Sequence, residues 1–117
     1  MELRLRRVDY PTLKMVHARL TSLCVNLMRL EEIKSFRLPQ ELDLRASMVI
    51  SDMKEILEHL GDDAKIPREV SDSVNMVRAY AYISTREGVD FVTENSDRIL
   101  RAVRWCISSL ERYLARR

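Results

Sequence analysis

Glycine and proline are scarce in this sequence, since its 117 residues include two glycines and three prolines. An all-β fold needs frequent turns, which these two residues usually supply, so their scarcity argues against many short strands. Two glycines also cannot form a glycine-rich phosphate-binding loop. The composition therefore favours long helices with few interruptions.

Cysteine and long apolar runs are scarce as well. The two cysteines, Cys24 and Cys106, are too few for the disulfide framework of a small secreted protein. Residues 1–7 carry charge with no apolar segment behind them, so we expect no signal peptide. The longest apolar run, residues 79–83, is too short to span a bilayer. These absences predict a cytoplasmic protein with no membrane partner.

The charged side chains nearly balance, because 20 basic and 18 acidic residues give a net charge of +2. Such a balance gives no sign of a polyanionic partner. The basic set is uneven, however, with 16 arginines against 4 lysines. Arginine suits bidentate recognition of carboxylate or phosphate and stacks on aromatic rings, although codon use or thermal adaptation explains the same excess.

Apolar residues recur three and four positions apart in four successive segments, which places each set on one face of a helix. The four stripes are Leu13, Val16, Leu20, Leu23, Leu27 and Leu30; Leu42, Ala46, Val49, Met53, Ile56 and Leu60; Val70, Val74, Val77 and Ala81; and Val92, Ile99, Val103, Cys106, Leu110 and Leu114, with Ser96 in one slot. The regular spacing predicts four amphipathic helices.

Prolines and glycines mark the expected helix ends. A proline precedes each of the first three stripes, and the third helix should begin at Pro67. Gly61 and Gly88 follow the second and third stripes, where glycine commonly ends a helix. Asp90 is the expected N-cap of the last helix.

Four helices with short connections must run antiparallel to their neighbours in sequence. We therefore predict an all-α fold, a four-helix antiparallel up-and-down bundle with the four stripes at its core. Residues 10–117 are expected to form a single domain, and residues 1–9 an N-terminal arm that is either flexible or a short extended segment. A chain of this length can bury a useful core.

The third helix carries a second apolar edge, formed by Met76, Tyr80 and Ile83, more than a quarter turn from its main stripe. So wide an apolar face implies burial on two sides. The second side faces either the bundle or another subunit, and we predict these three residues as an oligomer interface.

The fourth helix has an unusual polar face. Within an arc of about 60°, roughly opposite the apolar stripe, lie Arg98, Arg101, Arg112 and Arg116. Trp105 falls inside the same arc, and so does Glu94. Tryptophan and arginine are enriched at binding hot spots, and they also hold phosphate and stack on nucleic-acid bases.

Three interpretations of this face stay open. In the first, it binds other protein subunits or a second copy of the chain, giving a homo-oligomer such as a dimer. In the second, it binds nucleic acid, aided by the arginines near the chain ends, Arg4, Arg6, Arg7 and Arg117. Glu94 and the small net charge weaken this interpretation. In the third, the N-terminal arm covers Trp105 and the arginines pair with Glu94 or Glu111. We favour a non-enzymatic helical interaction module, self-associating or part of a larger assembly.

Enzymatic chemistry finds little support in the sequence. No nucleophile, base and positioning acid can be assembled, so we predict no catalytic residue and no cofactor. Glu55 and His59 lie four apart, but a di-metal bundle needs ligands from several helices, so no metal site is predicted. His17 leaves histidine phosphotransfer as a distant alternative, although its neighbours match neither sensor kinases nor phosphotransfer domains.

Overall fold

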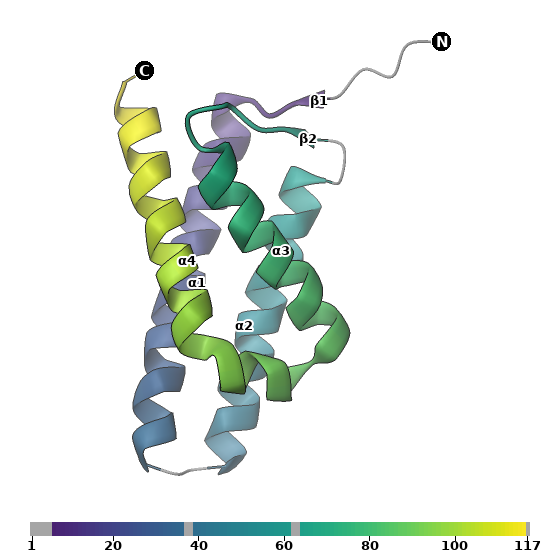
Figure 1. Ribbon diagram of the computed structural model, residues 1–117, viewed down its shortest axis with the longest axis vertical. Coiled ribbons are helices and arrows are strands. Elements are labelled where there is room, and N and C mark those ends of the chain that lie inside the picture. Colours follow the sequence, from purple (N-terminus) through teal and green to yellow (C-terminus); the bar gives the residue numbers. More distant parts are fainter. Residues whose placement is uncertain (1–5, 37–38, 62–63, 117) are drawn as a thin grey trace.

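The computed structural model describes residues 6–36, 39–61 and 64–116, and these contain four long helices (Figure 1). The helices are α1 (Tyr10–Phe36), α2 (Pro39–Leu60), α3 (Ser71–Glu87) and α4 (Val89–Ala115). Successive helices run in opposite directions, and they close a ring in which α1 and α3 each pack against both α2 and α4. The predicted four-helix antiparallel up-and-down bundle is confirmed.

The predicted stripes form the core. Each residue of the first stripe is at most 1% exposed. In the other stripes, only Leu42 and Leu114 are not fully buried, and both pack against the same core. Ser96 is buried in its slot on α4. Removal of apolar side chains from water, at roughly 1.5–3 kcal/mol for each buried leucine or isoleucine, is the main force that holds the helices together.

Glycine ends two helices as predicted. α2 stops at Leu60, and Gly61 has a φ of +72° with its N–H donating to the carbonyl oxygen of Leu57 at 2.8 Å. Gly88 is the single residue between α3 and α4, and its φ of +92° is one that residues with a side chain avoid. Its N–H donates to the carbonyl oxygen of Ser84 at 2.9 Å, which closes α3.

The third helix begins later than predicted, at Ser71 rather than at Pro67. Residues 68–70 form a turn instead, in which the N–H of Val70 donates to the carbonyl oxygen of Pro67 at 3.1 Å. α3 therefore has 17 residues and is the shortest helix, while α1 and α4 have 27 each.

The predicted N-cap of the last helix was wrong. Gly88 occupies that position, and Asp90 is the second residue of α4. The helical hydrogen bonds of α4 begin directly after the turn, because the N–H of Val92 donates to the carbonyl oxygen of Gly88 at 3.3 Å. Gly88 therefore accepts the first helical hydrogen bond.

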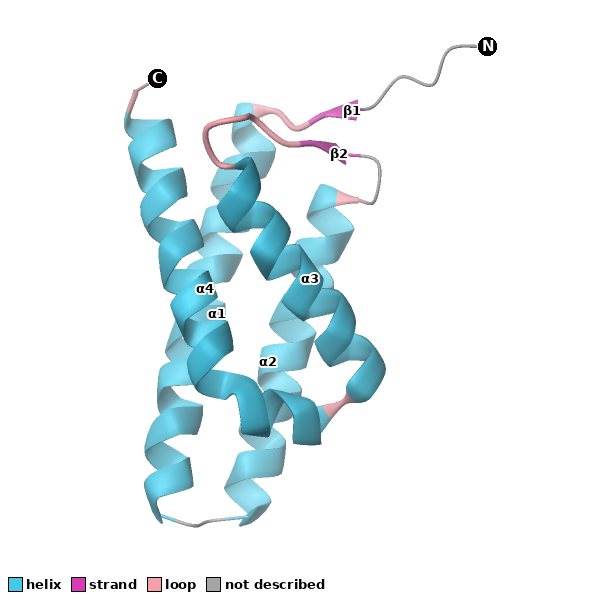
Figure 2. Cartoon of the chain, in the orientation of Figure 1, coloured by secondary structure: helices cyan, strands magenta, loops and turns pink. Residues whose placement is uncertain are grey.

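The chain before α1 lies along one end of the bundle. Strand β1 (Arg6–Arg7) pairs in parallel with strand β2 (Ala64–Lys65), which precedes α3 (Figure 2). Val8 extends the pairing, because its N–H donates to the carbonyl oxygen of Lys65 at 3.2 Å, and its side chain joins the core. Residues 6–8 of the expected arm are thus a short extended segment, and residues 1–5 lie outside the described residues.

A buried polar network joins α1 to α2. Asp52 is 6% exposed and accepts hydrogen bonds from Ser22 Oγ at 3.1 Å and Asn26 Nδ2 at 2.8 Å. Arg19 Nη1 lies 3.5 Å from the same carboxylate, and Arg45 Nη1 donates to Asn26 Oδ1 at 2.9 Å. Because buried polar groups are costly without partners, this network restricts how the two helices can face one another.

Candidate interaction surface

A shallow groove lies between α3 and α4 on the outside of the bundle. It has a volume of about 320 Å³ and is lined by Met76, Tyr80, Arg98, Arg101, Ala102 and Trp105. The structure thus brings together residues that were predicted as two separate surfaces, one on each helix. We call this feature the Trp105 groove.

Helical spacing explains how the sequence builds the groove. Met76 and Tyr80 lie four positions apart on α3, and Arg98, Arg101 and Trp105 lie three and four positions apart on α4, so each set lies along one line. Ala102 is 7% exposed and has a small side chain, which leaves the space between the two helices open. The antiparallel course of α3 and α4 then sets the two lines side by side.

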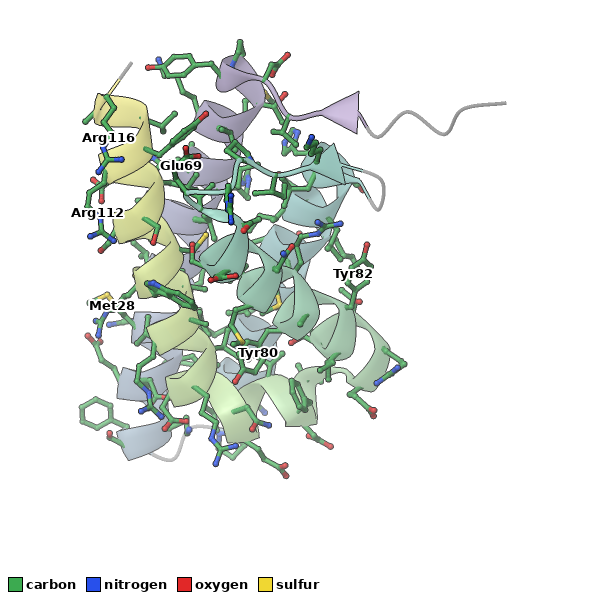
Figure 3. The ribbon with its side chains drawn as sticks, turned by 45° about the horizontal axis from the view of Figure 1, so that its top comes forward. Met28, Glu69, Tyr80, Tyr82, Arg112 and Arg116 are labelled. Atoms are coloured by element: carbon green, nitrogen blue, oxygen red, sulfur yellow. The ribbon has the colours of Figure 1, made fainter. Side chains whose placement is uncertain are left out.

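The aromatic and apolar side chains of the groove differ in exposure. Trp105 and Met76 are each 45% exposed, so the described residues leave nearly half of each side chain's surface open. Tyr80 is partly buried and packs against the core. Figure 3 shows it on the side of α3 that faces α4, whereas Tyr82 points away from that helix. The groove therefore combines a tyrosine ring packed against the core with two apolar side chains that are each nearly half exposed.

The two groove arginines are only weakly neutralised by nearby acids. Arg101 Nη2 lies 3.6 Å from Asp97 Oδ2, but both side chains are mostly exposed, and such pairs contribute little. Arg98 makes no ion pair among the described residues. Among the described residues, no arginine forms the ion pair with Glu94 or Glu111 that the third interpretation requires. Glu111 Oε2 instead lies 3.9 Å from His17 Nε2.

Arg112 and Arg116 lie apart from the Trp105 groove. Near the C-terminal end of α4, a separate hollow of about 240 Å³ is lined by Glu69, Ser109, Arg112, Tyr113 and Arg116 (Figure 3). It adjoins a hollow of about 430 Å³, lined by Lys65, Ile66, Pro67, Arg68, Glu69 and Tyr113. The linings of these two hollows therefore combine four basic side chains with one glutamate.

The remaining predicted site residues lie elsewhere. Ile83 is partly buried and does not line the Trp105 groove. Arg4 and Arg117 lie outside the described residues, as do the side chains of Arg6 and Arg7. The structure therefore joins two of the three predicted interface residues of α3 with three of the five predicted binding residues of α4.

Among the residues of these hollows that were not identified from the sequence are Ala102, Lys65, Arg68 and Glu69. The sequence could have pointed to Ala102, because a small side chain between Arg101 and Trp105 indicates a place where another helix can approach closely. No pattern in the sequence relates the other three, which precede α3, to the end of α4.

His17 and Cys106 are two chemically reactive side chains that the fold buries in part or in full. His17 has a side chain that is 29% exposed, yet its Nε2 atom is buried without a hydrogen-bond partner in the described residues. This burial does not favour phosphotransfer at Nε2, which would have to be accessible to a phosphoryl donor. Burial raises the pKa of the Cys106 thiol to about 12, against a smaller opposite effect of a hydrogen bond with Ser73. The thiol is therefore protonated at neutral pH.

Within the described ranges, every helix is too short or too polar to span a bilayer. These ranges also bring no three His, Cys, Asp or Glu side chains close enough to share a metal ion. When the chain is compared with protein-family models, with curated proteins and with solved structures, none of them matches it.

Proposed function

We propose that this protein is a non-enzymatic interaction module that joins a second copy of itself or another protein subunit through the Trp105 groove. The observation that carries the proposal is the indole ring of Trp105, 45% exposed beside an equally exposed Met76. Tryptophan and arginine are the side chains most often found at the energetic centre of protein interfaces. Both occur together here.

The groove has the layout of a small interface. Its apolar centre consists of Trp105, Met76 and the packed ring of Tyr80, while Arg98 and Arg101 supply donors to the side. A tryptophan side chain has roughly 250 Å² of surface, so covering the exposed 45% removes about 110 Å² from water. At about 25 cal/mol per Å², that burial contributes roughly 2–3 kcal/mol to association.

We infer a cytoplasmic location for this module. Cys24 and Cys106 are both free thiols in the structure. A cytoplasm that keeps thiols reduced suits two unpaired cysteines. The raised pKa of Cys106 further limits oxidation, because the thiolate is the reactive form.

Light scattering over a range of protein concentrations tests the proposal. We expect Trp105→Ala to weaken binding to a partner subunit by roughly 30- to 100-fold, which corresponds to the 2–3 kcal/mol above. Self-association should weaken by at least as much, because both copies then lose the indole ring. Phe36→Ala is the matched control, because this ring is 72% exposed but lies at the end of α1, outside the groove. A wild-type protein that stays monomeric and captures no partner, or a Trp105→Ala variant that associates normally, contradicts the proposal.

Nucleic-acid binding is the second candidate, and the basic hollows near the end of α4 favour it. Exposed side chains that could reach phosphates there are Lys65, Arg68, Arg112 and Arg116. Tyr113 lines both hollows and could stack on a base. Glu69 lines them too and would repel phosphate.

This second candidate predicts an oligonucleotide affinity that falls steeply with added salt. The salt dependence should become shallower when Arg112 and Arg116 are replaced by alanine, because fewer counterions are then released. Absence of oligonucleotide binding at low salt would reject it.

A further inference from the structure

We propose that the partner seated against the Trp105 groove is α4 of a second copy, running antiparallel about a two-fold axis midway between Arg101 and Trp105. This inference rests on the proposed function, since it requires the groove to be a protein interface. It adds the identity of the partner and the register of the contact.

The outer face of α4 carries a continuous exposed line of side chains. Spaced alternately four and three apart, the exposed residues are Glu94, Arg98, Arg101, Trp105, Ser108 and Arg112. That spacing keeps side chains aligned along a helix and is the pattern by which one helix packs lengthwise on another. The line points away from the buried stripe of α4, so a neighbouring helix can lie along it.

The order of charges along the line is self-complementary. Its N-terminal part is acidic at Glu94, with Asp90 one turn before it, and its C-terminal part is basic at Arg112, with Arg116 one turn after it. In a parallel pair, each of these residues would face its own copy, and like charges would meet. The antiparallel register instead sets Glu94 opposite the second copy's Arg112, and Asp90 opposite its Arg116. Two-fold symmetry makes each contact occur twice.

At the centre of this register, Arg101 of each copy meets Trp105 of the other. Arginine commonly stacks on tryptophan, the most favourable aromatic ring for a cation. Arg101 is free to do so, because its pair with Asp97 is exposed and weak. Met76 and Tyr80 then flank the two indole rings, and Ala102 allows close approach.

The charges within one chain leave the required groups available. Glu69 shares a hollow with Arg112 and Arg116 (Figure 3), but among the described residues it forms no ion pair with either. Glu94 likewise has no ion-pair partner there. A nucleic acid fits this line less well than a second copy does, because Glu94 and Asp97 would repel phosphates beside the arginines.

Two charge-reversal variants test the register. Glu94→Arg sets two arginines against each other at both symmetric contacts, and Arg112→Glu sets two glutamates against each other. We expect each variant alone to dissociate about tenfold or more readily than wild type. In an equimolar mixture, every contact between the two variants is again between opposite charges. The mixture should therefore form a heterodimer, with a dissociation constant within about threefold of wild type.

Analytical ultracentrifugation of each variant and of the mixture, at matched concentrations and moderate salt, provides the measurement. Lys54→Glu is the control for a change of charge, because Lys54 is exposed on α2 and lies outside the groove. All the substituted side chains are exposed, so circular dichroism should show the wild-type fold.

The outcomes separate this inference from the proposed function. A wild-type monomer that binds another protein through Trp105 overturns the second-copy partner and leaves the interaction module standing. If Trp105→Ala weakens the dimer but mixing Glu94→Arg with Arg112→Glu does not restore wild-type affinity, the register alone is overturned. If the protein stays monomeric and binds an oligonucleotide, and if Glu94→Arg strengthens that binding while Arg112→Glu weakens it, the proposal is overturned in favour of nucleic-acid binding.

Discussion

Replacing Asp52 by alanine tests how α1 and α2 are held together. The carboxylate of Asp52 is 6% exposed, and it accepts hydrogen bonds from Ser22 Oγ at 3.1 Å and Asn26 Nδ2 at 2.8 Å. Arg19 Nη1 lies 3.5 Å away. In Asp52→Ala these donors lose their shared acceptor while they stay between the two helices.

The size of the effect follows from how far each donor can reach water. Asn26 is 8% exposed, so its amide bears most of the cost of an unmet hydrogen bond, about 1–3 kcal/mol. Ser22 is partly exposed and is less affected. Arg19 is 38% exposed and keeps Glu55 at 2.8 Å, so its loss is small. We therefore expect Asp52→Ala to lower the free energy of unfolding by about 2–4 kcal/mol.

Urea unfolding followed by circular dichroism measures this change, with a lower midpoint and an unchanged slope as the expected result. Glu55→Ala is the matched control, because it removes the other carboxylate beside Arg19. That carboxylate is 41% exposed, so the free energy of unfolding should fall by less than about 1 kcal/mol. The double variant Asn26→Ala, Asp52→Ala should lose less than the sum of the single variants. If Asp52→Ala unfolds within about 0.5 kcal/mol of wild type, or no more easily than Glu55→Ala, the reasoning about the network is refuted.

Three further predictions concern Gly88 and the cysteines. Gly88→Ala should lower the free energy of unfolding by about 1–3 kcal/mol in the same urea assay, because a residue with a side chain is strained at φ of +92° and ψ of −163°. The loss would come from the backbone alone, since nothing lies within 4 Å of an added Cβ, and an unchanged free energy of unfolding would show that the turn relaxes. At pH 8, a thiol reagent should modify the partly exposed Cys24 while the folded protein protects Cys106, and equal rates would contradict the burial of Cys106. Because burial raises the pKa of Cys106 in the folded state, its contribution to the free energy of unfolding should be complete below about pH 9 and should be lost as the pH rises toward 12. Comparing the pH dependence of unfolding with that of Cys106→Ala measures this contribution.

The sequence by itself determined the four helices and the composition of the core. Leucines such as Leu20 and Leu23, which recur at helical spacing on a chain with few turn residues, are predicted to face the core, and both are 0% exposed. Because the connections between helices are short, helices that follow one another in the sequence must pack antiparallel. Local signals misled only at helix starts, as at Asp90, because the backbone of Gly88 decided where bonding resumed.

Only the tertiary structure decided what the outer face of α4 meets. A helical spacing places Trp105 and Arg112 in one arc, but it carries no information about the neighbouring helix. α3 runs antiparallel to α4 from the single connecting residue Gly88, so Trp105 faces Met76 of α3, whereas Arg112 lies beside Glu69, before α3 begins. The buried network around Asp52 and the docking of Val8 at the bundle end also depend on residues distant in sequence. Such contacts arise from packing in three dimensions, which the period of apolar side chains along a chain does not encode.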